Sequence, residues 1–221
     1  MTRIKICGIT NEKDALWASN AGVDFIGLNF YKNSPRKISA EMAKKITSKL
    51  PEFVKSVGVF VDEEIDVLLK TIKKTQLKLV QLHGNESPEY CDELKSKISE
   101  SLPPDTLWEN KPQIIKAFRI NNDFPVENIS KFNNADYFLL DTFVEDIPGG
   151  TGEVFNWDIA IEAKKAGKPI FLSGGLNPEN VTEAIKRVEP FAVDACSGIE
   201  RTPTRKDYDK MLAFVKAVRK I

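Results

Sequence analysis

Histidine is almost absent from this chain, since His83 is the only one in 221 residues. Sites that need two imidazoles are thereby excluded, and a Ser-His-Asp triad could be built only on this residue. Cysteine is also scarce. Cys7, Cys91 and Cys196 lie far apart in the sequence and form no CxxC pair. This spacing argues against a disulfide framework or a thiolate zinc site, and it favours a reducing compartment.

The chain has no excess of either charge, because 32 Lys and Arg residues balance 32 Asp and Glu residues. Without a basic field, neither nucleic acid nor an anionic membrane surface is an expected partner. The first residues lead directly into a strand pattern, and no run approaches the ~18 apolar residues of a membrane span. We therefore expect a soluble, cytoplasmic protein with no membrane segment, in which any bound anion is held locally.

Two common nucleotide-binding fingerprints are missing, since no GxGxxG follows the first strand pattern and no Walker A loop occurs. Instead, eight strand patterns alternate with helix patterns, at the spacing of βαβ units. This predicts an α/β fold, a (β/α)8 TIM barrel forming one domain over residues 1–221, rather than an open doubly wound sheet. The predicted strands are Arg3–Cys7, Phe25–Phe30, Ser56–Val61, Leu79–Gly84, Ile114–Phe118, Tyr137–Asp141, Pro169–Ser173 and Phe191–Ala195.

Start and stop signals place helices between these strands. The first four are expected to start near Asn11, at Ser39 (ending at Leu50), at Asp62 and at Ser87-Pro88. The others are expected in Val126–Asn133, where the helix is short, and over Asn156–Ala166, Pro178–Val188 and Lys206–Lys220. The segment 99–112 is a longer connection on the face opposite an active site, and we interpret it as a structural elaboration or a contact surface.

The first strand has one apolar and one polar face. Ile4 and Ile6 share one parity, whereas Lys5 and Cys7 share the other. In a barrel the isoleucines would pack against helices, and Cys7 would face the interior at the carboxyl end of its strand. Active-site residues of barrels lie at that end, although a lone cysteine in an apolar context is more often a small buried hydrophobe.

Polar side chains at other strand ends extend this candidate site. Asp141 ends an apolar strand and suits a general acid, and Asp194 occupies the same kind of position and competes for that role. Gln81 and His83 share the inward parity of their strand, although a hydrogen-bonded core histidine is the commoner case. Arg36 could hold a carboxylate in its fork, although a solvated surface arginine is commoner. Gln81, His83, Asp194 and Arg36 are our candidate substrate-binding residues.

Two turns bear glycine after the last two strands. Ser173-Gly174-Gly175 follows the seventh strand, and Ser197-Gly198-Ile199 follows the eighth. Many barrels hold a phosphate at this place, where glycines let backbone N–H groups approach the anion. Gly174, Gly175, Ser197 and Gly198 are therefore predicted to bind phosphate, with ordinary tight turns as the alternative.

Eight short motifs occur in order from the first strand to the eighth. They are Lys5-Ile6-Cys7-Gly8-Ile9-Thr10, Asn33-Ser34-Pro35-Arg36, Val57-Gly58-Val59-Phe60, Gln81-Leu82-His83-Gly84, Leu140-Asp141-Thr142, Gly149-Gly150-Thr151-Gly152, Ser173-Gly174-Gly175-Leu176 and Ser197-Gly198-Ile199-Glu200. Together they resemble the phosphoribosylanthranilate isomerase family over nearly the whole chain. Any one motif alone would be weak, but their combination is specific.

The resemblance implies a (β/α)8 barrel that performs the Amadori rearrangement of tryptophan biosynthesis on a small phosphosugar, with neither metal nor organic cofactor. It implies that Cys7 is the general base and Asp141 the general acid. Arg36 would hold the anthranilate carboxylate, and the two glycine turns the phosphate. A monomer or a homodimer is expected. Lys5 could favour the Cys7 thiolate or could instead pair with a carboxylate inside the barrel.

The chain also departs from the family pattern. Asn29 stands where an apolar residue is frequent, and Asn156 stands where Asp is usual before Trp157. The segment 201–207 reads RTPTRKD, where Ser-Pro-Gly-x-Lys-Asp is expected. One rival is the histidine-pathway aminoaldose isomerase, a related barrel with Asp in place of Cys7. Another is a non-catalytic phosphosugar-binding barrel, which would not need Cys7 together with Asp141.

Overall fold

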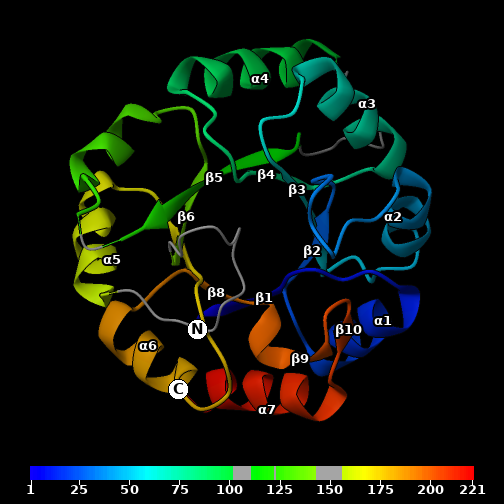
Figure 1. The fold of residues 1–221 in the computed structure, drawn as a ribbon, viewed down its shortest axis with the longest axis vertical. Helices are drawn as coiled ribbons and strands as arrows, with labels where there is room; N and C mark the ends of the chain where they lie inside the picture. Colours follow the sequence, from blue (N-terminus) through cyan, green and yellow to red (C-terminus); the bar gives the residue numbers. More distant parts are fainter. Residues whose placement is uncertain (102–110, 122, 143–155) are drawn as a thin grey trace.

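The computed structural model describes residues 1–101, 111–121, 123–142 and 156–221. Its eight parallel strands close into a barrel, in which each strand pairs with its neighbours in sequence and β8 pairs with β1. Figure 1 looks down this barrel, with the helices in a ring outside it. The predicted (β/α)8 architecture is confirmed. The strands are β1 (Arg3–Ile6), β2 (Phe25–Asn29), β3 (Lys55–Phe60), β4 (Leu79–Leu82), β5 (Gln113–Ile120), β6 (Tyr137–Thr142), β7 (Ile170–Leu172) and β8 (Ala192–Ala195).

The helices cover the outside of the strands. The α-helices are α1 (Glu12–Ala21), α2 (Ala40–Thr47), α3 (Ile65–Thr75), α4 (Pro88–Ser101), α5 (Trp157–Ala163), α6 (Val181–Val188) and α7 (Tyr208–Arg219). Two predicted N-caps are present: the side chains of Asn11 and Ser39 accept hydrogen bonds from the backbone N–H groups of Asp14 and Met42. None of the helices in the described part of the chain is long and apolar enough to span a membrane.

Three helix predictions are wrong in kind or in position. The third helix begins at Ile65 rather than at Asp62, because the Asp62 carboxylate accepts a hydrogen bond from Asn85 N at 2.7 Å instead of capping a helix. The fifth element is a short 3-10 helix, η1 (Val126–Lys131). The seventh begins at Val181, because Asn177 and Asn180 form a side-chain-bonded turn before it.

The predicted sixth and eighth helices are also divided differently. The predicted sixth helix is α5 followed by the 3-10 turn η2 (Lys164–Ala166). A 3-10 turn, η3 (Ser197–Ile199), follows β8 and leads into a hairpin of β9 (Glu200–Thr202) and β10 (Arg205–Lys206). Lys206 therefore belongs to the hairpin, and α7 begins only at Tyr208. Most of the 99–112 connection lies outside the described residues.

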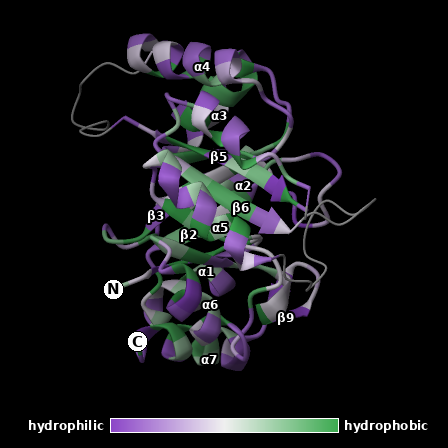
Figure 2. Ribbon diagram, turned by 90° about the vertical axis from the view of Figure 1, so that its left-hand side faces the viewer, coloured by the Kyte–Doolittle hydropathy of each residue, from purple (hydrophilic) through white to green (hydrophobic). Residues whose placement is uncertain are grey.

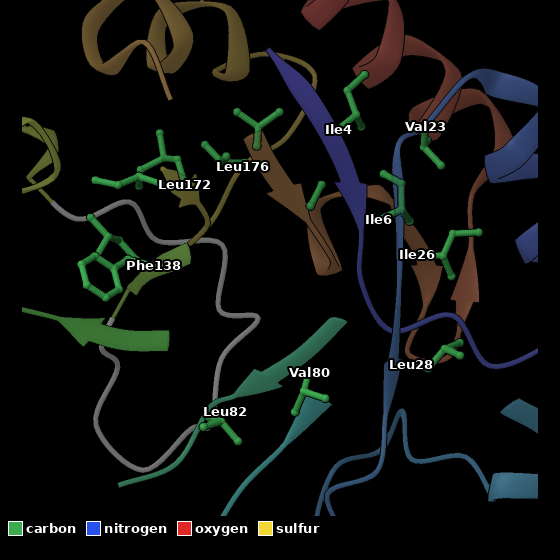
Figure 3. Packing of buried hydrophobic residues seen from close by; sticks show 14 of the residues in the cluster. Ile4, Ile6, Val23, Ile26, Leu28, Val80, Leu82, Phe138, Leu172 and Leu176 are labelled. Atoms are coloured by element: carbon green, nitrogen blue, oxygen red, sulfur yellow. The ribbon is translucent and has the colours of Figure 1, made fainter. Parts of the chain in front are cut away.

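Alternation along the strands creates two separate cores. Ile4 and Ile6 point outward and, with residues such as Leu28, Val80 and Leu172, pack between strands and helices (Figure 3). Figure 2 shows the strands as mainly hydrophobic, whereas the helices carry many hydrophilic residues. The floor of the barrel interior is a second apolar cluster, formed by Phe25, Val57, Leu79, Ile115, Ala117, Leu139, Phe171 and Ala192.

Polar groups form the next layer of the interior, above this apolar floor. Three of these groups, Gln81, Asp141 and Asp194, each follow a floor residue of their own strand by two positions and so face the interior. The fourth, Lys5, binds Asp194, and all four are buried. The predicted inward direction of Lys5 is thus confirmed. The apolar floor keeps water away from these groups from below, so their charges must be compensated within the barrel.

Thr204 adopts a left-handed backbone conformation, with φ of 75°, in the turn between β9 and β10. This is the position at which the family pattern has glycine. A non-glycine residue in this region costs roughly 1–2 kcal/mol. The carbonyl of Thr204 accepts a hydrogen bond from the Thr10 hydroxyl at 2.7 Å, which holds the turn beside the loop after β1.

We expect Thr204→Gly to raise the free energy of unfolding by about 0.5–1 kcal/mol, because the relief of strain exceeds the entropy that glycine adds to the unfolded chain. Urea unfolding followed by circular dichroism measures this change. Thr202→Gly is the matched control, since Thr202 lies in strand β9 and the substitution there should destabilise. Equal effects of the two substitutions would contradict the account.

Candidate active site

The pairing of β1 with β8 brings two thiols together at the carboxyl end of the barrel. Ile6 is in register with Ala195, and Cys7 N donates to Ala195 O at 2.9 Å, so Cys7 and Cys196 follow paired residues. Both side chains line the same cavity. A Cβ at Gly27 would come within 2.7 Å of the Cys7 Sγ, so a residue without a side chain is needed beside this thiol.

The two thiols titrate as a pair. A hydrogen bond to Cys196 and burial raise the pKa of Cys7 well above its ordinary value, although the charge of Lys5 acts in the opposite direction. The same hydrogen bond, opposed by burial and assisted by Lys206 and Arg36, lowers the pKa of Cys196 to about 7. The pair therefore releases one proton near neutrality and retains the second. Lys5 acts in the predicted direction but is not the main influence on Cys7.

Lys5 forms a buried ion pair with Asp194, with its Nζ 2.7 Å from Asp194 Oδ2. This confirms the alternative that Lys5 pairs with a carboxylate inside the barrel. Burial lowers the pKa of Lys5, but the charge and hydrogen bond of Asp194 and the charges of Cys7 and Cys196 together outweigh it and raise that pKa. Burial raises the pKa of Asp194 to about 7 despite the charge of Lys5. Asp194 Oδ1 is buried and has no hydrogen-bond partner among the described residues.

Gln81, His83 and Asp141 form a polar row across β4 and β6. The Gln81 amide nitrogen lies 2.6 Å from His83 Nδ1, and His83 Nε2 lies 3.3 Å from Asp141 Oδ2. If the amide nitrogen donates to Nδ1, the ring proton is on Nε2 and faces the Asp141 carboxylate. His83 is not a core histidine, because its half-buried ring lines the cavity.

Arg36 lies in the loop after β2 and is held by Glu200 at the start of β9. Its Nε and Nη2 donate to the two carboxylate oxygens of Glu200 at 2.8 and 2.7 Å. Lys206 Nζ donates to Glu200 Oε1 at 2.8 Å and to the carbonyl of Cys196 at 3.0 Å. Arg36 is therefore not a solvated surface residue, and its guanidinium lines the cavity.

The two glycine turns pack against each other. A Cβ at Gly198 would lie 2.3 Å from the carbonyl oxygen of Leu176, so the turn after β8 touches the turn after β7. Gly174 has φ of 87°, and a Cβ there would come within 2.6 Å of the Thr142 backbone nitrogen. Side-chain-free backbone is therefore needed at both places. The Gly150-Thr151-Gly152 part of the sixth motif lies outside the described residues.

The candidate acid, base and substrate-binding residues surround a cavity at the carboxyl ends of the strands, whereas Gly174, Gly175, Ser197 and Gly198 are not among its lining residues. Cys7, Arg36, Gln81, His83, Asp141, Ser173, Asp194 and Cys196 all line it. A wider hollow of about 710 Å³ adjoins it and shares Tyr31, Val61, His83 and Arg119 with it. The hollow has the size of a small-molecule site.

Three residues of this site were missed in the sequence: Cys196, Glu200 and Lys206. Cys196 could have been found by parity, because it is two positions after Asp194, as Cys7 is two positions after Lys5. Glu200 stands within one of the eight motifs but had no assigned role. Lys206 begins the helix predicted over Lys206–Lys220, and that prediction gives no indication of a contact with Glu200.

A closed parallel barrel with titratable side chains around one cavity at its carboxyl end is the arrangement of (β/α)8-barrel enzymes. A profile of the N-(5'phosphoribosyl)anthranilate (PRA) isomerase family matches residues 4–217. The isomerase of Trichlorobacter lovleyi is 42% identical over 98% of this chain and 97% of its own. The solved Thermotoga maritima isomerase is 39% identical, with a TM-score of 0.88 and full coverage of both chains.

Another solved isomerase of this kind was crystallised with reduced 1-(o-carboxyphenylamino)-1-deoxyribulose 5-phosphate; it is 38% identical, with a TM-score of 0.84 and full coverage of both chains. The chain belongs to the N-(5'-phosphoribosyl)anthranilate isomerase family. It is therefore an enzyme, an isomerase of tryptophan biosynthesis.

We expect Lys5→Met to lower the free energy of unfolding by about 3–5 kcal/mol at pH 8, because it leaves Asp194 as an unpaired buried charge. The loss should be smaller at pH 6. Burial raises the pKa of Asp194 to about 7 with Lys5 present, and loss of the Lys5 charge raises it further, so as pH falls more of the folded variant holds a proton on Asp194, which removes the unpaired charge. Urea unfolding at the two pH values measures this difference.

Lys95→Met is the control, since its ion pair with Asp136 is partly exposed and its loss should cost little at either pH. An equal loss at pH 6 and pH 8 in Lys5→Met would contradict the assignment of the buried charge to Asp194.

Proposed function

We propose that this chain converts N-(5'-phosphoribosyl)anthranilate to 1-(2-carboxyphenylamino)-1-deoxyribulose 5-phosphate by general acid–base catalysis, with Asp141 as the acid and Cys7 as the base. The observation that carries the proposal is that both residues line one cavity together with a forked arginine. Carboxylic acid, thiolate and guanidinium are the groups that a proton-transfer reaction on a carboxylate-bearing substrate requires.

The first step is ring opening. The protonated Asp141 carboxyl gives its proton to the ribose ring oxygen, and the C1'–O bond breaks as the anthranilate nitrogen forms an iminium with C1'. Asp141 is the residue before the last of β6 and lines the cavity, so it can reach a sugar bound there. The His83 Nε2 at 3.3 Å lies close enough to exchange a proton with this carboxyl through a small movement.

The second step removes the proton from C2', which the iminium has made acidic. The Cys7 thiolate takes this proton and leaves an enolamine, which relaxes to the ketone as one proton moves from the C2' hydroxyl to C1'. The proton that Cys7 has taken from C2' is released to solvent, and Asp141 takes one up from solvent, so acid and base return to their starting states and the overall reaction is an isomerisation. The pair of thiols carries one negative charge above about pH 7, and because their hydrogen bond favours it on Cys196, the Cys7 proton passes to Cys196 along that bond before Cys7 acts as the base.

Asp194 and Gln81 bind the sugar. Asp194 Oδ1 and Gln81 Oε1 are buried oxygen acceptors that have no hydrogen-bond partner in the described part of the chain, and both residues line the cavity. Sugar hydroxyls are donors that satisfy such oxygens. Because Asp194 is held by Lys5, we assign it to substrate binding and leave the acid to Asp141.

Arg36 holds the anthranilate carboxylate, and the two glycine turns hold the phosphate. The contact between Gly198 and the Leu176 carbonyl supports one shared anion site, made by the backbone of Gly174, Gly175, Ser197 and Gly198. Ser173, which precedes the first turn, lines the cavity and connects this site to the reacting centre.

The proposed partner is this small phosphosugar alone, taken up by a cytoplasmic monomer or homodimer. A solved Thermotoga maritima relative is described as dimeric, with monomers generated from it. The histidine-pathway rival is disfavoured because its first strand carries Asp in place of Cys7. A non-catalytic barrel would leave the position of Cys7 beside the cavity without a use.

We expect Asp141→Asn and Cys7→Ala each to lower kcat by about 10²- to 10⁴-fold, the usual contribution of a general acid or base. The assay follows the fluorescence of the anthranilate substrate as it is consumed. Cys91→Ala and Asp158→Asn are the matched controls, since Cys91 is buried in α4 and Asp158 pairs with Arg187 on the outside of the barrel. Wild-type protein that does not consume the substrate would refute the function, and unchanged rates in the two variants would refute the roles.

A further inference from the structure

Glu200 already binds two of the N–H groups of the Arg36 guanidinium. Its Nε and Nη2 form a two-bond fork with Glu200, and the side chains of both residues are largely buried, at 14% and 5% exposure. A guanidinium has five N–H donors, of which the fork uses two. The remaining edge, made by Nη1 and the second N–H of Nη2, has no partner in the described part of the chain.

The aliphatic part and the backbone of Arg36 are also held in place. The aliphatic part crosses Gly8 so closely that a Cβ there would lie 2.5 Å from Arg36 Cδ. Ser34 Oγ accepts a hydrogen bond from the backbone N–H of Arg36 at 3.2 Å. With the aliphatic part and one edge both held, the guanidinium is fixed in place, and Arg36 lines the cavity that contains Cys7 and Asp141.

Arg36, Glu200 and Lys206 form a charge cluster beside the thiol pair, with Lys206 3.8 Å from the Cys196 Sγ. Burial would raise the pKa of Glu200, but the Arg36 fork and the charge of Lys206 outweigh it, so Glu200 remains ionised. A neutral Arg–Glu pair would attract a third, anionic group only weakly. Lys206, which is fully buried and 2.8 Å from Glu200 Oε1, brings the cluster to one net positive charge.

The β9–β10 hairpin carries both Glu200 and Lys206, which are far from Arg36 in the sequence. Lys206 is in register with Glu200 across the hairpin, and the backbone N–H of Lys206 donates to Asp14 Oδ2 in α1 at 3.0 Å. The hairpin is therefore fixed to the first helix on one side and, on the other, presents Glu200 to Arg36 with Lys206 bound to the same carboxylate.

We propose that Glu200 and Lys206 are positioning residues that determine recognition of the substrate carboxylate through Arg36. Glu200 orients the guanidinium so that its free edge faces the cavity, and Lys206 keeps the cluster positive while Glu200 is charged. Neither touches the substrate. This inference rests on the proposed function, which assigns the anthranilate carboxylate to Arg36.

The test uses two ligands that differ only in the carboxylate. One is the reduced product, 1-(o-carboxyphenylamino)-1-deoxyribulose 5-phosphate reduced at its ketone, and the other is the same molecule with a phenylamino group. Kd values are measured by calorimetry for wild type and variants. In wild type the carboxylate should tighten binding about 10- to 100-fold, the size of a charge-assisted bidentate contact.

Arg36→Met removes the guanidinium, and we expect this variant to bind the two ligands with the same Kd. In Glu200→Gln and Lys206→Met we expect the preference for the carboxylate ligand to fall at least fivefold, while the Kd of the phenylamino ligand changes less than twofold. Glutamine offers Arg36 one acceptor and one donor where two acceptors are needed. Arg205→Met is the matched control, since Arg205 is exposed on the same hairpin, and it should keep the wild-type preference.

Variants are first compared with wild type by circular dichroism, and Glu200→Asp replaces Glu200→Gln if the latter is unfolded, because the shorter side chain also cannot maintain the fork. Equal weakening of both ligands in the Glu200 and Lys206 variants would show a merely structural role and overturn the inference. If wild type itself binds both ligands alike, the assignment of Arg36 in the proposed function is wrong, which is a distinct failure.

Discussion

The seam at which β8 pairs with β1 is the constraint on which the site depends. Closing the barrel puts Lys5 in register with Asp194 and forms their buried ion pair at 2.7 Å. The same register carries Cys7 and Cys196 past the last paired residues and into one cavity. A slip of one residue would turn every side chain of the strand to its other face, so the ion pair and the thiol pair would be lost together.

Compensation of charge extends outward from this seam. Lys206 lies 3.8 Å from the Cys196 Sγ and also binds Glu200, which in turn holds Arg36. The reacting thiols and the arginine are thus joined by one buried set of opposite charges. Removing one member of such a set leaves another uncompensated in an environment of low polarity, which is far more costly than losing an exposed pair.

Much of the fold could be predicted because strand parity and helix caps are local signals. The apolar residues Ile4 and Ile6 indicate one face of β1, and Asn11 and Ser39 cap helices where their side chains suggest it. The helix start predicted at Asp62 is wrong because the Asp62 carboxylate accepts a hydrogen bond from the backbone N–H of Asn85, 23 residues later in the chain. Local propensity cannot show such a distant hydrogen bond.

The site residues that stand at strand ends could be predicted from the sequence, but the contacts between the site residues could not. Cys7, Gln81, His83, Asp141 and Asp194 were found because the fold collects strand ends on one side of the barrel. That Asp194 meets Lys5, or that Glu200 and Lys206 meet Arg36, depends on barrel closure and on a hairpin that the sequence pattern did not indicate. Thr204, in a conformation that favours glycine, helps to explain why this hairpin was missed.

Closure at the seam makes Cys7 and Cys196 share one negative charge near neutral pH. Ultraviolet absorbance of the thiolate, followed as a function of pH, tests this directly. We expect one thiolate that forms with a midpoint near pH 7 in wild type and is lost from that range in Cys196→Ala, whereas Cys91, whose pKa burial raises to about 12, contributes no thiolate there. Wild-type protein in which no thiolate forms below pH 9 would contradict this sharing of the charge.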